Sequence, residues 1–331
     1  MDRKVRMEDI AERMGVSTVS VYKALSGKSG VSNTLRARIM ECAEQMGYVT
    51  LRNKPETKPE HKTKNIGVVM PEHFFDINSF YSGLYRQVVK CCSELGYTAL
   101  LELIPREAEE NCILPVIVQR RNVDGILFLG QISVEYIHAI ANYGQPYLLL
   151  DFYDDRIDAD SITSDNISGG YRLTSYLLQT GRTKIGFLGT QSATSSIMDR
   201  FLGYTKALLQ ANIPISSEWI LKDRNEYGEL ITLELPENMP EAFVCSCDKV
   251  AVDLVELLKS KGYRVPEDVA VAGYDDNILA QMCSPKLTTY RVNVEAMGSL
   301  AVSRLIRRID GKRLASGMTS PKGELILRES T

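Results

Sequence analysis

Short apolar segments alternate with helix-length amphipathic segments over most of this chain, from Asn65 to the last residues. This alternation favours parallel sheets with helices on both faces, because a parallel connection needs a crossover of a dozen or more residues. The segment is long for one open sheet, so we predict two similar subdomains with a cleft between them, outside the carboxyl ends of the strands. The predicted strands are 66–70, 99–103, 125–130, 147–152, 184–189, 242–247 and 268–276, and the predicted helices include Phe80–Leu95, Ile113–Asn122, Asn166–Thr180, Asp199–Asn212 and Lys249–Gly262.

The first fifty residues have a different pattern. The stretch MEDIAERMGVSTVSVYKALSG (7–27) contains two helical runs too short to be stable alone, so they must pack together. Ala11, Gly15 and Val21 lie where a helix-turn-helix needs a small residue, a turn glycine and a buried branched residue. A small three-helix protein-docking module is the alternative. We also predict Ser17 as the N-cap of the second helix, and a third helix capped by Ser32, with an inner stripe of Leu35, Ile39, Ala43 and Met46 and an end at Gly47.

The net charge differs between residues 1–64, here called the head, and residues 65–331, here called the body. Residues 1–64 hold 13 Lys+Arg against 8 Asp+Glu, whereas residues 65–331 hold 26 against 34. A basic head on an acidic body indicates that the head is the part that binds a polyanion. The polar segment TLRNKPETKPEHKTK is typical of a linker, so we predict domains at 1–49 and 65–331, joined by 50–64.

The motifs of several enzyme classes are missing from the sequence. The first strand, IGVVMPEHFF, lacks the GxGxxG of a dinucleotide site, and we find neither a nucleophile elbow nor a metal-ligand cluster. We therefore predict a non-enzyme with no catalytic residues, metal or cofactor. An α/β enzyme, or a binding or sensor protein that does not act on DNA, remains the alternative.

The cysteines and the apolar segments bear on location. Seven cysteines are scattered along the chain without zinc spacing, which favours reduced thiols in a cytoplasmic protein. The N-terminus lacks the pattern of a signal peptide, and no apolar run reaches the roughly 20 residues that span a bilayer. We expect a cytoplasmic protein without a membrane partner.

Several motifs, in order, resemble the lactose-repressor/galactose-repressor (LacI/GalR) family of bacterial transcription regulators. They are the head, NIGVVMP, DNISGGYRLTSYLLQTGRTKIGFLG, DRFLGYTKAL, YRVPEDVAVAGYDD, PKLTTYRVNVEAMGSLAV and ELILREST. The resemblance implies a sequence-specific regulator, most often a repressor. Such a protein is a homodimer that binds a palindromic operator and is controlled by a small, sugar-like effector.

The same resemblance implies the fold. It is an N-terminal all-α helix-turn-helix domain and an α/β body like a periplasmic sugar-binding protein, with two doubly wound parallel-sheet subdomains. The N-subdomain covers about 65–161 and 293–318, and the C-subdomain about 165–290 and 323–331. The chain crosses between them near 161–165, 290–293 and 318–323, and ELILREST returns to the C-subdomain.

In a helix-turn-helix, the start of the second helix enters the major groove. Thr18 offers a methyl or hydroxyl group to a base edge, and Val19 can pack on a thymine methyl. Lys23 lies where the family has a basic residue, although lysine lacks the fixed fork of arginine. Tyr22 replaces the family's usual serine, so its role is open. The predicted DNA-binding residues are Ser17, Thr18, Val19, Ser20, Tyr22 and Lys23.

The linker departs from the family, whose members have a hinge helix with a leucine that enters the minor groove. Thr57 stands at the position of that leucine, between Pro55 and Pro59, and prolines disfavour a helix. A flexible basic arm on phosphates and a disordered tether are both consistent with this composition.

The resemblance places effector contacts at three positions. Asp151 follows the strand YLLLDF, Arg200 precedes GYTKAL, and Asp275 lies in the AGYDD loop. An aspartate with an arginine can bind adjacent hydroxyl groups, or the arginine can bind a carboxylate.

Another departure lies at FVCSCDKVA, where Cys247 replaces the asparagine that often precedes Asp248 in the family. Losing that amide weakens the case for a typical hexose and leaves open a sugar acid, a deoxysugar, a nucleoside or no small effector. The loop PEHFFDINSFYSG offers further candidate contacts. They are Phe74, Phe75, Phe80 and Tyr81 as walls and Asn78 as a polar contact, and some of these aromatic residues belong to the core.

Overall fold

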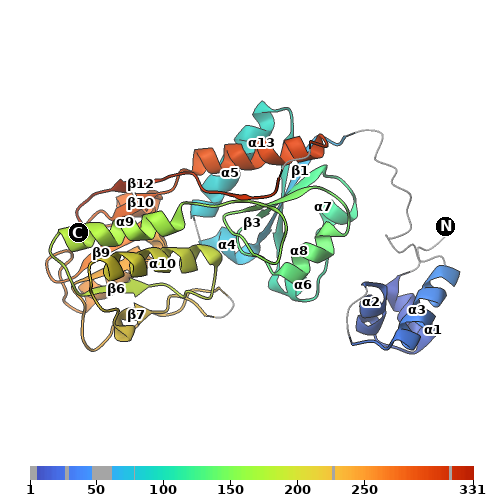
Figure 1. The fold of residues 1–331 in the computed structure, drawn as a ribbon, viewed down its shortest axis with the longest axis horizontal. Helices are drawn as coiled ribbons and strands as arrows, with labels where there is room; N and C mark the ends of the chain where they lie inside the picture. The colour runs from blue at the N-terminus through green and yellow to red at the C-terminus, as the bar shows by residue number, and fades with distance from the viewer. Residues whose placement is uncertain (1–5, 27–29, 47–61, 78, 226–227, 313–314) are drawn as a thin grey trace. The chain divides into compact units, whose positions relative to one another are not determined.

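The computed structural model describes residues 6–26, 30–46, 62–77, 79–225, 228–312 and 315–331. The chain divides into two compact units, Met1–Lys62 and Thr63–Thr331 (Figure 1). Asn78, Gly47 and most of the predicted linker, including Thr57, lie outside the described residues.

The N-terminal unit consists of α1 (Met7–Met14), α2 (Thr18–Ser26) and α3 (Asn33–Gln45). Gly15 ends α1 with φ 64°, and its N–H reaches the carbonyls of Ala11 and Glu12. This left-handed conformation favours glycine, as the sequence predicted. The predicted apolar face of the unit is confirmed: its core contains Ile10, Ala11, Val21, Ala24, Ile39, Cys42 and Ala43, with Met14, Val16, Leu25, Leu35 and Met46 packed against it.

Two serines start the second and third helices. The Ser17 hydroxyl accepts from the Ser20 N–H at 3.1 Å, and the Ser32 hydroxyl accepts from the Leu35 N–H at 3.3 Å. Each bond satisfies an N–H that the first helical turn would leave without a partner. Both predicted caps are therefore present.

The body contains two six-stranded sheets, as predicted (Figure 1). Sheet A has the order β11-β5-β4-β3-β1-β2 and sheet B the order β12-β10-β9-β8-β6-β7. All pairs are parallel except β10 with β12, which is antiparallel. Sheet A consists of β1 (Asn65–Pro71), β2 (Thr98–Ile104), β3 (Gly125–Leu129), β4 (Tyr147–Leu150), β5 (Asp160–Ile162) and β11 (Met318–Thr319); sheet B consists of β6 (Ile185–Leu188), β7 (Ile220–Leu221), β8 (Ala242–Cys245), β9 (Ala270–Asp275), β10 (Thr288–Arg291) and β12 (Glu324–Ile326).

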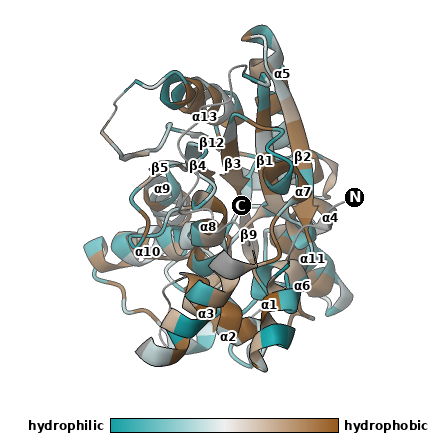
Figure 2. Ribbon diagram, turned by 90° about the vertical axis from the view of Figure 1, so that its right-hand side faces the viewer, coloured by the Kyte–Doolittle hydropathy of each residue, from teal (hydrophilic) through white to brown (hydrophobic). Residues whose placement is uncertain are grey.

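Helices cover both faces of each sheet because successive strand residues point to opposite faces. In β1, Val68 belongs to the core under α5 (Ser79–Glu94) and α13 (Val294–Ile309), while Val69 belongs to the core under α8 (Val134–Ala141). Figure 2 shows the central strands mainly in brown, whereas the covering helices alternate brown and teal. Sheet B is covered by α9 (Asn166–Gln179) and α10 (Ser195–Gln210) on one face and by α11 (Asp248–Ser260) on the other.

The chain passes between the sheets after β5, after β10 and after β11, close to the three predicted crossings. The C-terminal strand β12 pairs with β10 in sheet B, as expected for ELILREST.

Several helices differ from the prediction. The predicted helix Ile113–Asn122 shortens to α7 (Val116–Gln119), because Pro115 fixes its start and Arg121 has φ 54° just beyond its end. The segment after β1, predicted as a loop, contains α4 (Glu72–Ile77). Besides α8 and α13, the short helices α6 (Arg106–Glu110), α12 (Ile278–Met282) and the 3-10 helix Ser217–Trp219 were not predicted.

Candidate functional site

At the start of α2, some side chains are exposed and others bond to each other. Thr18 and Val19 are exposed, with Val19 at 58%. The hydroxyls of Ser17 and Ser20 lie 2.9 Å apart and hydrogen-bond to each other. Thr18 and Val19 are thus the groups most open to a base edge, while the two serines also shape the turn.

The second turn of α2 is anchored to α3. The Arg36 guanidinium donates to the carbonyls of Lys23 and Ala24 at 3.0 and 3.1 Å. Tyr22 and Lys23 are half-buried, and a Cβ at Gly30 would lie 3.4 Å from the Lys23 ammonium. Arg36 therefore fixes the backbone from which the Lys23 side chain extends.

In the body, three predicted effector residues come together from different elements. Asp151 follows β4 with φ 70°, and Asp275 ends β9 with φ 113°. Each aspartate therefore lies at the end of a strand with its own backbone in a strained conformation. Arg200, in α10, lies with its Nη2 atom 3.8 Å from Asp275 Oδ1. All three are buried, at 3%, 6% and 5% exposure for Asp151, Asp275 and Arg200.

Arg200 is held in place by its neighbours. Its Nε atom donates to Asn166 Oδ1 at 2.8 Å, and its Nη1 atom donates to the Ser246 carbonyl. The guanidinium carbon lies 3.8 Å from the centre of the Tyr274 ring, a cation–π distance. The arginine is therefore fixed in orientation before any ligand arrives.

Each carboxylate has one buried oxygen that accepts no hydrogen bond from the described residues, although Asp275 Oδ1 lies at ion-pair distance from Arg200. Asp151 Oδ2 accepts from the Tyr81 hydroxyl at 2.9 Å, but among the described residues neither Asp151 Oδ1 nor Asp275 Oδ1 has a hydrogen-bond partner. Burial raises the pKa of Asp151 to about 6 and the pKa of Asp275 well above its usual value, and in both cases Arg200 opposes the shift. Buried polar atoms without partners are costly, so these two oxygens indicate a place for a ligand.

The predicted aromatic residues lie next to these carboxylates. Phe74, on α4, packs against Tyr81 with ring centres 4.8 Å apart, and Phe80 packs edge-on against Tyr81 at 5.2 Å. Phe80 and Phe74 are 5% and 7% exposed, whereas Phe75 is 39% exposed. Tyr81 thus connects an aromatic cluster to Asp151.

Asp248 has a structural role in this arrangement. Its carboxylate accepts from the Thr289 hydroxyl at 2.6 Å and from the Asn277 N–H at 2.9 Å, and its exposure is 0%. Burial raises its pKa to about 7. The protein itself occupies both oxygens, so Asp248 is left out of the effector-binding residues proposed below. Its neighbour Cys247 is buried, and burial raises the pKa of its thiol to about 11.

Direct hydrogen bonds close the two halves of the body over these groups. The Ser196 hydroxyl, at the start of α10, donates to the Asp151 carbonyl at 2.8 Å. The Tyr153 hydroxyl donates to Asp199 at 3.0 Å. These bonds join the half of the body that carries Asp151 to the half that carries α10.

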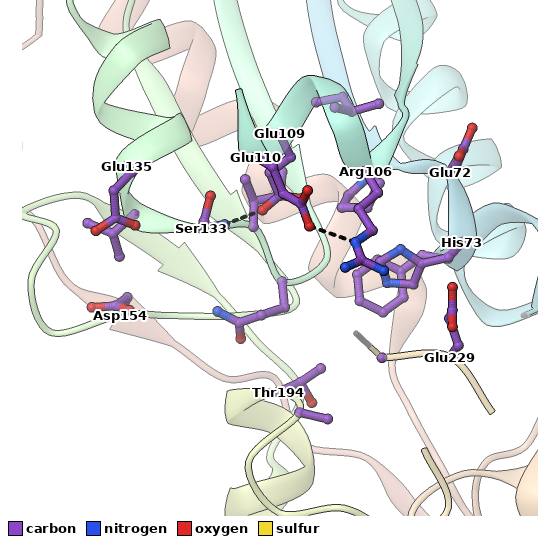
Figure 3. Close-up of a pocket in the computed structure, with 18 of the residues that line it drawn as sticks. Glu72, His73, Arg106, Glu109, Glu110, Ser133, Glu135, Asp154, Thr194 and Glu229 are labelled. Carbon is purple, nitrogen blue, oxygen red and sulfur yellow. Dashed lines mark hydrogen bonds and ion pairs between the residues drawn. The ribbon is translucent and has the colours of Figure 1, made fainter. Parts of the chain in front are cut away.

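A cavity with a volume of about 530 Å³ lies beside this cluster, with Phe74 in its wall (Figure 3). Of the predicted effector residues that the structure describes, only Phe74 lines it. Figure 3 shows the Arg106–Glu110 ion pair at 2.7 Å and the Glu109 carboxylate accepting from the Ser133 N–H at 2.7 Å. The sequence analysis did not predict the charged lining of this cavity, and the acidic run REAEEN (106–111) was its one signal in the sequence. The charged residues are Glu72, Arg106, Glu109, Glu110, Glu135, Asp154, Arg156 and Glu229, and His73 lies among them.

Within the described residues, the structure has neither a metal-ligand cluster nor a membrane-spanning helix. Across these ranges, no group of three or more His, Cys, Asp or Glu residues could hold a metal ion. Within the same ranges, no helix is long and apolar enough to cross a membrane.

Two family models match the chain. The model for bacterial regulatory proteins of the lacI family matches residues 6–50, and the model for a periplasmic binding protein-like domain matches residues 174–331. The first match covers the three-helix unit, and the second covers sheet B with the C-terminal segments.

Full-length relatives and structures agree with these matches. The HTH-type transcriptional repressor PurR of Vibrio campbellii is 26% identical over 330 residues, which cover 98% of each chain. Among solved structures, the transcriptional regulator CelR–cellobiose complex has a TM-score of 0.74 at 23% identity, covering 99% of this chain and 100% of that one. The lac repressor dimer bound to operator and the anti-inducer ONPF has a TM-score of 0.66 at 20% identity, covering 99% of both chains. These two structures support the fold.

Proposed function

The chain belongs to the lacI family of bacterial regulatory proteins, and from this membership we propose how this DNA-binding transcriptional regulator binds its operator and its effector. It is a member of a family of regulators, not of enzymes. We place it in the cytoplasm as a homodimer whose two heads bind the half-sites of a palindromic operator.

The DNA contacts we propose come from the start of α2. Thr18 and Val19 offer a methyl, a hydroxyl and an apolar surface to base edges, and Lys23 adds a charged donor. Ser17, Ser20 and Tyr22 complete the surface of the helix, and the hydroxyls of the two serines bond to each other beside the turn that Ser17 caps.

The effector contacts we propose lie between sheets A and B. The observation that carries this proposal is the pair of free, buried oxygens, Asp151 Oδ1 and Asp275 Oδ1, next to the fixed Arg200 guanidinium. Hydroxyl groups of a carbohydrate-like effector would donate to these oxygens, and Tyr81 and Phe74 would provide an aromatic wall. The cellobiose in the CelR complex supports a carbohydrate as the ligand class.

Effector binding would change the operator affinity through the closure of the two halves. The Ser196 and Tyr153 hydrogen bonds join sheet A to α10, so an effector that alters this contact alters the position of the N-terminal sheet to which the head is linked. Such coupling is about 1–3 kcal/mol in known cases and acts equally in both directions.

Selection of binding sites from a library of random DNA duplexes tests the proposed operator binding. Purified full-length protein should enrich, from a random duplex library, a palindrome with half-sites about one helical turn apart. Lys23→Ala should lower the affinity for the selected palindrome about fivefold and reduce its salt dependence, because one cationic contact is lost.

Arg38→Ala provides the control. Arg38 is an exposed cation on α3, so this variant loses the same charge outside α2. Equal losses of affinity in both variants, with unchanged sequence preference, would remove Lys23 from the residues that read the operator.

A further inference from the structure

A second arginine, Arg224, lines the cleft between the two halves. It follows β7, and its side chain is 12% exposed. It borders a small pocket of about 20 Å³, enough for about one water molecule. The other residues of this pocket are His73, Phe74, Gly228, Leu230, Cys247 and Lys249.

Asp223 holds Arg224 in place by one edge of the guanidinium. Nε and Nη2 donate to the two carboxylate oxygens at 3.2 and 2.9 Å. The same carboxylate, which is fully buried, also accepts from the Thr190 N–H at 2.8 Å and from the Ser246 hydroxyl at 2.6 Å. Asp223 is therefore satisfied by four hydrogen bonds, while Nη1 of Arg224 makes none with the residues that the structure describes.

The surroundings of Arg224 favour an anion. No carboxylate is among the described residues that line the small pocket. Burial lowers the pKa of His73 and the Arg224 guanidinium lowers it further, while the Glu229 carboxylate opposes the shift, so the protonated, cationic form of this imidazole is disfavoured. Lys249 is paired with Asp253, on the next turn of its helix. The positive end of α11 also begins here, because Cys247 is its N-cap residue and makes no side-chain capping bond.

The small pocket is connected to the Asp151–Arg200–Asp275 cluster through shared neighbours. Phe74 lines the pocket and packs against Tyr81, whose hydroxyl donates to Asp151 Oδ2. On the other side, Ser246 donates to Asp223 through its hydroxyl and accepts from Arg200 through its carbonyl. A ligand that extends from Asp151 and Asp275 to Arg224 would meet hydrogen-bond acceptors at one end and a fixed cationic donor at the other. The complementary molecule carries hydroxyl groups at one end and a negative charge at the other.

We propose that Arg224 is a specificity residue that selects an anionic effector, a sugar carrying a carboxylate or a phosphate, over the neutral sugar. This inference rests on the proposed function, because it assumes that the effector binds at Asp151, Arg200 and Asp275. The physical reason is that a charge-assisted bond to Nη1 forms only with the anion, and a neutral sugar leaves this donor unused.

The test uses full-length protein and matched probes in calorimetry and thermal-shift assays. The neutral probes are glucose and galactose, the carboxylates are glucuronate and galacturonate, and the phosphates are glucose 6-phosphate and galactose 6-phosphate. We expect at least one acid or phosphate to bind at least about tenfold more tightly than its neutral parent. The carboxylate and phosphate arms identify which anion the site takes.

Two variants test the role of Arg224 directly. Arg224→Met should remove the preference for the anion and leave the affinity for the neutral parent unchanged. Because this change leaves Asp223 buried without its cation, the double variant Asp223→Asn/Arg224→Met removes both charges and should give the same result in a folded protein. Lys222→Met removes an exposed charge nearby and should keep the wild-type preference.

The outcomes separate this inference from the proposed function. If a neutral sugar binds and the acids and phosphates bind no better, or if both Arg224 variants keep the anion preference, the inference is overturned while the proposed function stands. If none of the six probes binds, both the inference and the carbohydrate assignment fail.

Discussion

Gly203→Val is expected to destabilise the body by about 3 kcal/mol or more, because α9 and α10 touch through their backbones at this position. A Cβ at Gly203 would lie 2.2 Å from the Ile167 carbonyl oxygen and 2.7 Å from the Tyr171 nitrogen. Gly170 makes the reciprocal contact, since a Cβ there would lie 2.2 Å from the Arg200 carbonyl oxygen. These neighbours are backbone atoms, so the two helices must separate, and Arg200 must move with α10.

Chemical denaturation of the variant and the wild type measures this loss. Gly83→Ala is the control, because a Cβ at Gly83, inside α5, would meet only the end of Arg86 at 4.0 Å. Alanine is favoured over glycine within a helix, so this variant should be as stable as the wild type or more stable by about 0.5–1 kcal/mol. A Gly203→Val protein with wild-type stability would contradict the close approach of the two helices.

Arg200→Met should abolish the response to an effector and cost about 3–5 kcal/mol of stability, the usual loss when one member of a buried charged group is removed. The substitution leaves the Asn166 amide oxygen and the Ser246 carbonyl without their donor. It also removes the cation that opposes the raised pKa of Asp151 and of Asp275, so both carboxyl groups become harder to ionise.

The measurement is the melting temperature with and without the sugar or sugar acid that stabilises the wild type. A ligand at about 100 times its dissociation constant adds about 2.7 kcal/mol to the wild type and nothing to the variant. Arg264→Met removes an arginine whose side chain is 71% exposed, so it should keep both the melting temperature and the response. A folded Arg200→Met protein that still responds would show that the effector binds elsewhere.

The sequence was most informative where one local pattern determines the structure. Gly15 with φ 64° and the Ser17 and Ser32 caps follow from residue chemistry within a single turn. The central strands β1, β3, β4, β6, β8 and β9 follow from apolar runs that are buried on both faces, and these runs are readable without tertiary information. The shorter strands β5, β7, β10 and β11 were not among the apolar runs predicted as strands.

Tertiary contacts decided what the sequence analysis missed. In a sequence, an aspartate that follows a strand looks the same whether its carboxylate binds a ligand or another part of the protein. Asp151 and Asp275 keep a free oxygen, whereas Asp248 binds Thr289 and Asn277, which lie 41 and 29 residues away. The prediction also missed Arg224, because its meaning depends on Asp223, Thr190 and Ser246 meeting in space.

The central claim is that the body senses a metabolite and thereby changes how tightly the heads bind DNA. The most direct measurement is the dissociation constant of the full-length protein for its selected palindrome, with and without a saturating amount of the ligand that stabilises the body. We predict a change of at least about fivefold, with an equal change in ligand affinity when the palindrome is present, and no change in Arg200→Met. Identical dissociation constants with and without the ligand, in a protein that demonstrably binds both, would contradict the account.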